Sequence, residues 1–80
     1  MTEGLKDRLV ARAMALAVDA FDDDAATAEL CRLAAGDLPA VDEAMPACMA
    51  VQADLATRRR AIELLAHVRY GPCQHDHDEA

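Results

Sequence analysis

Hydrophobic residues recur with a helical period along most of the chain, and no stretch alternates as a half-buried strand would. In residues 3–21 they cover a wide face of one helix, while Arg8, Arg12 and Asp19 gather in a narrow polar strip. This pattern predicts a long first helix, packed against at least two others. Its apolar positions are Leu5, Leu9, Val10, Ala13, Leu16, Ala17, Ala20 and Phe21.

Three consecutive aspartates, Asp22, Asp23 and Asp24, separate this helix from a second one, predicted over residues 24–35. Aspartate disfavours helix interiors, favours N-caps, and complements the positive end of the helix dipole in the first turn. Gly36 fits the position after the helix, where a left-handed backbone costs glycine nothing. Capping alone is thus a sufficient explanation for the aspartates. The alternative is capping combined with a binding role.

The rest of the chain contains two prolines and a final helical stretch. Pro39 and Pro46 each suit the first turn of a helix. We therefore predict a short helix over residues 39–45, after which Pro46 starts a new helix or kinks a continuing one. Residues 47–70 are again helical in pattern, and Gly71 follows as a stop signal. Within them, Arg58 projects onto the apolar face, which indicates an ion pair with Asp54 or a bend around residues 56–57.

These elements predict an all-α protein. The expected architecture is a small antiparallel helical bundle of three main helices and one short helix, in one domain over residues 1–71, with a polar C-terminal tail over 72–80. Hydrophobic residues make up 54% of the chain, but it has one Phe, one Tyr and no Trp. Because alanine supplies much of the apolar content, we expect a thin core that favours a flat or grooved interaction surface over a deep enzyme cleft.

Charge is segregated along the chain, whose formal net charge is −7. Residues 19–54 carry nine acids and one arginine, a net of −8, whereas residues 1–18 carry a net of +1 and residues 55–70 a net of +3. The acidic block makes direct nucleic-acid binding unfavourable, because it repels phosphate. The run Arg58 to Arg60 is too small to reverse this, and we expect it to be solvated or to pair with acids on a neighbouring helix. The acidic block itself serves solubility or docks onto a basic protein.

The chain contains no apparent secretory signal or membrane-spanning stretch, and its three cysteines do not suit a secreted disulfide framework. We therefore predict a cytoplasmic protein. Cys31 and Cys48 occupy apolar positions and are predicted to be small core residues. Cys73 lies in the polar tail. Its thiol is either incidental, a metal ligand, or half of an intermolecular disulfide.

The tail also raises the question of a metal site. Alternate side chains of an extended segment point the same way, so Cys73, His75 and His77 would face one zinc ion together, with His67 as a fourth ligand. The ligands lack the usual arrangement in two separated pairs, so we favour a polar tail without a cofactor. Cys73 and a histidine could be drawn as a catalytic nucleophile and its base, but the sequence offers no third group to orient the histidine. The protein is thus predicted not to be an enzyme.

The candidate interaction site is the acidic surface. Its expected residues are Asp22, Asp23, Asp24, Glu29, Asp42 and Glu43. In its 80-residue length, its aspartate run and its acidic block over 19–54, the chain resembles the small acidic inhibitors of phages and mobile elements, anti-CRISPR proteins among them. The likeness is one of type, since no family motif is present. It implies a protein that occupies the basic surface of a nucleic-acid-binding partner. A host helical adaptor or subunit, and a zinc-binding protein using the tail, are the alternatives, and a homodimer is compatible with each.

Overall fold

The computed structural model describes residues 4–19 and 22–71. In this part of the chain it contains four α-helices and no strand, which confirms the all-α fold class. None of these helices has the length and apolar character needed to cross a membrane. The helices are α1 (Leu5–Asp19), α2 (Asp23–Ala34), α3 (Leu38–Ala47) and α4 (Leu55–Tyr70), with a 3₁₀ turn, η1 (Cys48–Ala50), after α3.

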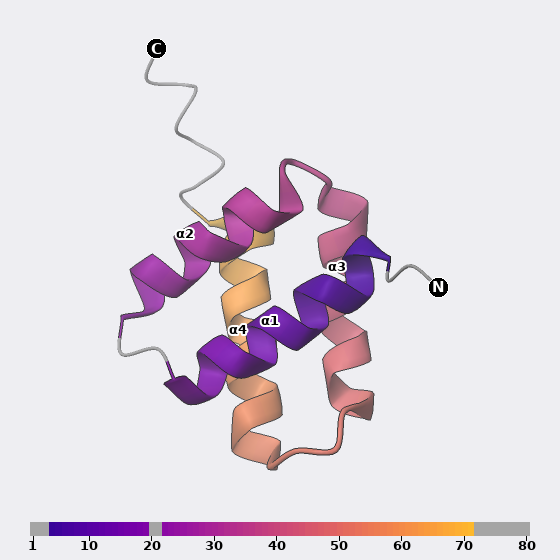
Figure 1. The fold of residues 1–80 in the computed structure, drawn as a ribbon, viewed down its shortest axis with the longest axis vertical. Coiled ribbons are helices and arrows are strands. Elements are labelled where there is room, and N and C mark those ends of the chain that lie inside the picture. The colour runs from indigo at the N-terminus through magenta and orange to yellow at the C-terminus, as the bar shows by residue number, and fades with distance from the viewer. Residues whose placement is uncertain (1–3, 20–21, 72–80) are drawn as a thin grey trace.

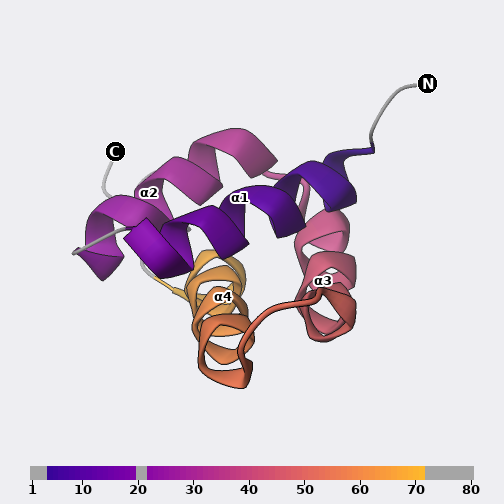
Figure 2. The same cartoon turned by 60° about the horizontal axis from the view of Figure 1, so that its bottom comes forward.

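The helices are arranged as two hairpins that cross each other. Helices α1 and α2 run in opposite directions in one layer, and α3 and α4 do the same in a second layer behind it (Figure 1). The turned view separates the two layers (Figure 2). Helices α1 and α4 pack against each other and against both other helices, whereas α2 and α3 touch each other least. Antiparallel packing is therefore present within each hairpin, and the hairpins are stacked crosswise.

The core combines a few large side chains with many alanines. The largest fully buried residues are Leu9, Leu30, Leu64, Leu65, Val41 and Cys48. Alanines are fully buried on all four helices, so the helix backbones can approach closely. On α1, the predicted apolar face is confirmed, because Leu9, Ala13 and Leu16 are buried and Leu5, Val10 and Ala17 pack beside them.

Side-chain caps set the start of both α2 and α3. The Asp22 carboxylate accepts a hydrogen bond from the Asp24 backbone N–H at 2.9 Å, so the predicted capping role is confirmed. Asp37 caps α3 in the same way, accepting from the Ala40 N–H at 3.2 Å. Between the two helices, Ala35 and Gly36 both adopt positive φ, of 52° and 85°. The expected glycine stop is thus present, and an alanine shares the left-handed conformation with it.

The predicted helix over residues 47–70 is wrong in its first third. Helix α3 continues through Pro46 to Ala47, tightens into η1, and gives way to a loop over residues 51–54 before α4 begins. Pro46 has no backbone N–H for the helical ladder, and α3 and α4 run antiparallel, so the chain must turn here. Arg58 is correspondingly not paired with Asp54. Its Nη1 donates to the Met49 carbonyl at 2.8 Å and ties η1 to α4.

Candidate functional site

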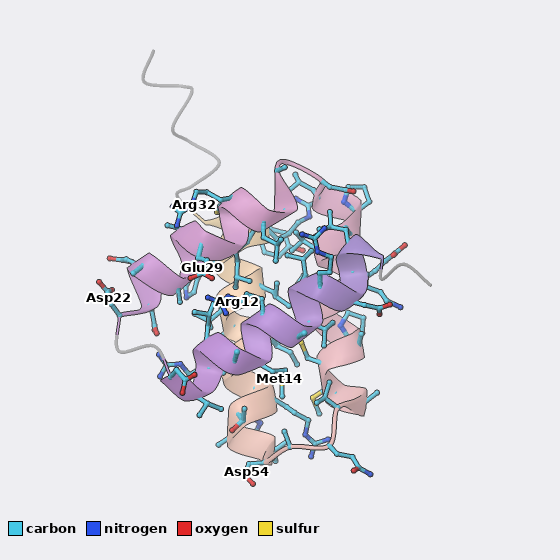
Figure 3. The ribbon with its side chains drawn as sticks, viewed as in Figure 1. Arg12, Met14, Asp22, Glu29, Arg32 and Asp54 are labelled. Atoms are coloured by element: carbon cyan, nitrogen blue, oxygen red, sulfur yellow. The ribbon has the colours of Figure 1, made fainter. Side chains whose placement is uncertain are left out.

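The three consecutive aspartates lie at the exposed start of α2. Asp22 projects from the outer end of this helix (Figure 3). The Asp23 carboxylate pairs with Arg60 of α4, with 2.7 Å between Oδ1 and Nη2. Asp24 is exposed, and its carboxylate has no partner among the described residues. The cluster predicted from the sequence therefore exists as three neighbouring carboxylates, of which one is a cap and one is in an ion pair.

Glu29 lies on a different side of α2, where the helix faces α1. Its carboxylate and the Nε of Arg12 form a hydrogen-bonded ion pair between the two helices (Figure 3). The hydrogen bond to Glu29 and then the charge of Glu29 raise the pKa of Arg12, with a smaller contribution from the charge of Asp19. Glu29 is thus committed to the α1–α2 contact, and it does not enlarge the exposed aspartate cluster.

Asp42 and Glu43 are carried by α3, in the other layer. The Asp42 carboxylate accepts from Nε of Arg69 on α4 at 2.8 Å. Glu43 is exposed and has no partner in the part of the chain that the structure describes. Because α2 and α3 make the fewest contacts of any helix pair named above, the six predicted residues do not form one continuous cluster. The structure brings together Asp22 to Asp24 and places the other three elsewhere.

The ion pairs between helices follow one rule. Each joins an acid on α2 or α3 to an arginine on α1 or α4, in the pairs Glu29–Arg12, Asp23–Arg60 and Asp42–Arg69. The segregation of charge along the sequence is thereby explained in part, since the acidic middle of the chain forms the two helices that dock onto the basic ones. The expectation that the arginine run pairs with a neighbouring helix is confirmed for Arg60.

The cysteines divide into two kinds. Cys48 is fully buried and free, as predicted, and its burial raises the pKa of its thiol from 9.0 to about 11. Cys31 packs against the core, which confirms its prediction in part, but it is only half-buried and it is disulfide-bonded. It lies at the border of the apolar face of α2, one residue after the buried Leu30.

The zinc ligands considered from the sequence are only partly within reach of the structure. His67 is exposed on the last turn of α4, and its carbonyl accepts from the Gly71 N–H at 2.7 Å. Cys73, His75 and His77 lie outside the described residues. Among the residues that are described, no three or more Cys, His, Asp or Glu side chains gather as a group fit for a metal ion.

Two further surface features lie away from the aspartate cluster. An open groove of about 350 Å³ runs between α1 and α2, lined by Arg8, Ala11, Arg12, Ala15 and Leu33. Around the turn between α3 and α4, Met49 and Leu55 are 44% and 47% exposed. The exposure of Met49 agrees with the methionine surface around Met45 and Met49 that the sequence indicates as a second contact region, whereas the groove was not predicted, because it depends on how two helices meet.

Comparison with known proteins finds no relative of this chain. No protein-family model matches the chain, and neither a curated protein nor a solved structure shows significant similarity to it.

Proposed function

We propose that the protein is a non-enzymatic binding module that docks onto the basic surface of a protein partner, with Asp22, Asp23 and Asp24 as the centre of its binding surface. The observation that carries this proposal is the exposure of three consecutive carboxylates at one helix start, with a single arginine, Arg60, to balance them. In the manner of the small acidic inhibitors that the chain resembles, the module would compete with nucleic acid for its partner in the cytoplasm.

The one ion pair within this cluster is compatible with binding. The side chains of Asp23 and Arg60 are 61% and 36% exposed, and exposed pairs typically contribute only about 0–1 kcal/mol to stability. A lysine or arginine of the partner can therefore replace Arg60 at little cost. Neighbouring carboxylates on one small surface also add their fields, which accelerates association with a positively charged partner.

The remaining predicted residues take supporting roles in this proposal. Glu29 and Asp42 hold α2 and α3 against the arginines of α1 and α4, and they add to the overall negative field. Glu43 contributes a second, smaller acidic position on α3. No cofactor is required by such a mechanism, because the interaction is purely electrostatic and steric.

A second candidate, an adaptor or subunit of a helical partner, is supported by the exposed Met49 and Leu55. Flexible methionine side chains suit contact with a helix in a groove. The partly buried Met45 lies in the preceding turn of α3 and would extend the same surface. This binding mode would depend weakly on salt, unlike docking through the aspartates.

The experiment begins with capture of partners from a lysate of the source organism and continues with binding kinetics for the purified pair. The test variant is Asp22→Asn/Asp23→Asn/Asp24→Asn, which retains a capping side chain. A control variant, Asp7→Asn/Asp19→Asn/Glu63→Gln, removes the same charge from dispersed positions. We expect a slower on-rate at low salt for the test variant, well beyond that of the control.

Three results would contradict the proposal: equal on-rates of the test variant and wild type, equal slowing by both variants, or association independent of salt. The first and third would transfer the binding surface to Met49 and Leu55. Substituting these two residues with serine would then be expected to abolish capture of the partner.

A further inference from the structure

We propose that two copies of this chain form a dimer through the outer face of the layer that α1 and α2 build. The inner face of this layer packs on α3 and α4, and no other helix of the described chain covers its outer face (Figures 1 and 2). The molecule is thinnest across its layers, 17 Å, in the direction along which Figure 1 is viewed. The outer face is therefore one of the two broad sides of the molecule.

Charge on this face is separated along the length of the α1–α2 hairpin. The open end of the hairpin carries Arg8, near the start of α1, and Arg32, in the last turn of α2. The closed end carries Asp19, the last residue of α1, and Asp24, in the first turn of α2. All four side chains belong to exposed residues. Neither guanidinium has a partner among the described residues, and the Asp24 carboxylate has none there either.

A face with one basic and one acidic end is complementary to itself. A two-fold rotation about an axis that lies in the plane of contact and crosses the hairpin lays α1 antiparallel on the α1 of the other copy, and α2 on its α2. The basic end of each copy then covers the acidic end of the other. Arg8 of one copy meets Asp19 of the other, Arg32 meets Asp24, and the symmetry makes each pair twice.

The register of the hairpin lets one axis serve both pairs. Pairing the two ends of α1 places the axis at the level between Ala13 and Met14, and pairing the two ends of α2 places it at Ala28. The ion pair between Arg12 and Glu29 sets these two residues side by side. Because α2 runs back along α1, Ala28 lies at the level of Ala13. The two positions of the axis agree to within one residue, about 1.5 Å.

The open groove between α1 and α2 adds an apolar contact. The same rotation brings the last turn of α1 from the other copy over this groove, whose floor contains Ala11 and Ala15. That turn carries Val18, which is 69% exposed. Val18 follows the buried Leu9 by nine residues, about two and a half turns, and so points away from the core. Covering this valine supplies a hydrophobic contribution that the ion pairs lack.

The size of the face makes the dimer reversible. Two helices of 15 and 12 residues, at about 1.5 Å per residue and about 10 Å across each, present a face of about 20 by 20 Å. This is at the lower end for specific interfaces, so the dimer forms at high concentration and dissociates on dilution. It does not depend on the proposed function. Asp24 belongs to both surfaces, however, so the dimer holds one carboxylate of the aspartate cluster away from a basic partner.

Charge reversal tests the dimer without any partner. Arg8→Asp makes both members of one pair acidic, and Asp19→Arg makes both basic, so each variant alone should dimerise about tenfold more weakly than wild type, or worse. Mixed in equal amounts, the two variants regain both contacts and should form a heterodimer of near wild-type affinity. Each new charge also suits the helix dipole, so the fold should be retained, as circular dichroism checks. Sedimentation equilibrium measures the dissociation constants.

The matched controls are Arg59→Asp and Glu63→Arg, which change the net charge equally at exposed positions of α4. Their dissociation constants should stay within about threefold of wild type, and mixing them should change nothing. A wild type that is monomeric up to about 500 µM would overturn the proposal. So would failure of the mixed variants to recover, equal weakening by the controls, or a dimer that persists on a denaturing gel without reductant, because that dimer is linked by a disulfide.

Discussion

The terminal helices and the middle helices of this molecule are stabilised differently. Helices α1 and α4 supply leucines to the core, among them Leu9, Leu64 and Leu65, whereas the buried residues of α2 and α3 are mostly alanines beside one Leu30 and one Val41. The middle helices compensate with caps at Asp22 and Asp37 and with acids that reach the arginines of α1 and α4.

The difference explains how a strongly acidic chain folds around so thin a core. Small side chains let the middle helices dock closely while contributing little buried area. Three of the five acids on α2 and α3 pair with arginines of the terminal helices, and the other two, Asp24 and Glu43, are exposed at the surface. The same segregation thus serves the fold and provides the exposed carboxylates on which the proposed function depends.

The largest expected effect is on the terminal helices. Leu9 is fully buried on α1, and the change Leu9→Asp places an unpaired charge in the core, which should abolish folding. Val18 lies on the same helix and is 69% exposed, so Val18→Asp is the matched control and should fold normally. Thermal unfolding followed by circular dichroism compares the stability of the two variants. A cooperative melt of Leu9→Asp would show that α1 is not part of the core.

The next effect concerns the thiol at the end of α3. The pKa of Cys48 is raised to about 11 from 9.0, so the unfolded chain ionises before the folded one. Stability from this residue is complete below pH 9 and is lost as the pH rises toward 11, by at most about 3 kcal/mol. We expect the advantage of Cys48 over Cys48→Ala to shrink across this range. Urea titrations in a Cys31→Ser/Cys73→Ser background measure it, and an advantage independent of pH would contradict burial of the thiol.

The close approach of the middle helices is tested by enlarging an alanine. Ala44 on α3 is fully buried, and Ala44→Leu should destabilise the fold by about 1–3 kcal/mol through overpacking. Ala50 is exposed in η1, so Ala50→Leu should change the free energy of unfolding little. If Ala44→Leu were neutral or stabilising in chemical denaturation, α3 would have room that a close-packed interface does not leave.

The cap of α3 has a smaller expected contribution. Removing the carboxylate with Asp37→Ala leaves the Ala40 N–H without its acceptor and should cost about 1 kcal/mol. Asp37→Asn keeps an oxygen acceptor and should retain most of the stability. Chemical denaturation of the two variants decides the point, since equal losses would assign the effect to charge and not to the hydrogen bond.

The smallest effect is that of a single ion pair. A double-mutant cycle on Asp42 and Arg69, with each residue changed to alanine, should give a coupling of about 0.2–1 kcal/mol, because both side chains are partly exposed. The coupling should fall when salt is raised. A coupling that is larger and insensitive to salt would mean that charge, and not packing, holds α3 in place.

Local signals made much of this fold predictable. The apolar period of α1, the aspartate cap of α2, and Pro39 in the first turn of α3 all depend on neighbours within a few residues, and the structure agrees with each. The loop over residues 51–54 was missed because its sequence, Val-Gln-Ala-Asp, contains no Gly or Pro. The break there is imposed by the antiparallel packing of α3 and α4, which no local pattern records.

The candidate site was less predictable, for a related reason. An acid's charge is evident in the sequence, but its partner is not. Glu29 and Arg12 are 17 residues apart, and Asp23 and Arg60 are 37 apart. The sequence therefore identified Asp22 to Asp24 as a cluster and did not reveal that Glu29 and Asp42 would be paired.

The packing of α1 against α4 bears on how the protein is made. These helices contact each other directly, yet α4 is the last of the four to leave the ribosome. Until then, the leucines of α1 lack the surface that covers them, and the middle helices lack the arginines of α4. We therefore expect the nascent chain to stay unfolded, and open to chaperones and proteases, until α4 has emerged. Folding would then be a single late event governed by contacts between distant parts of the chain.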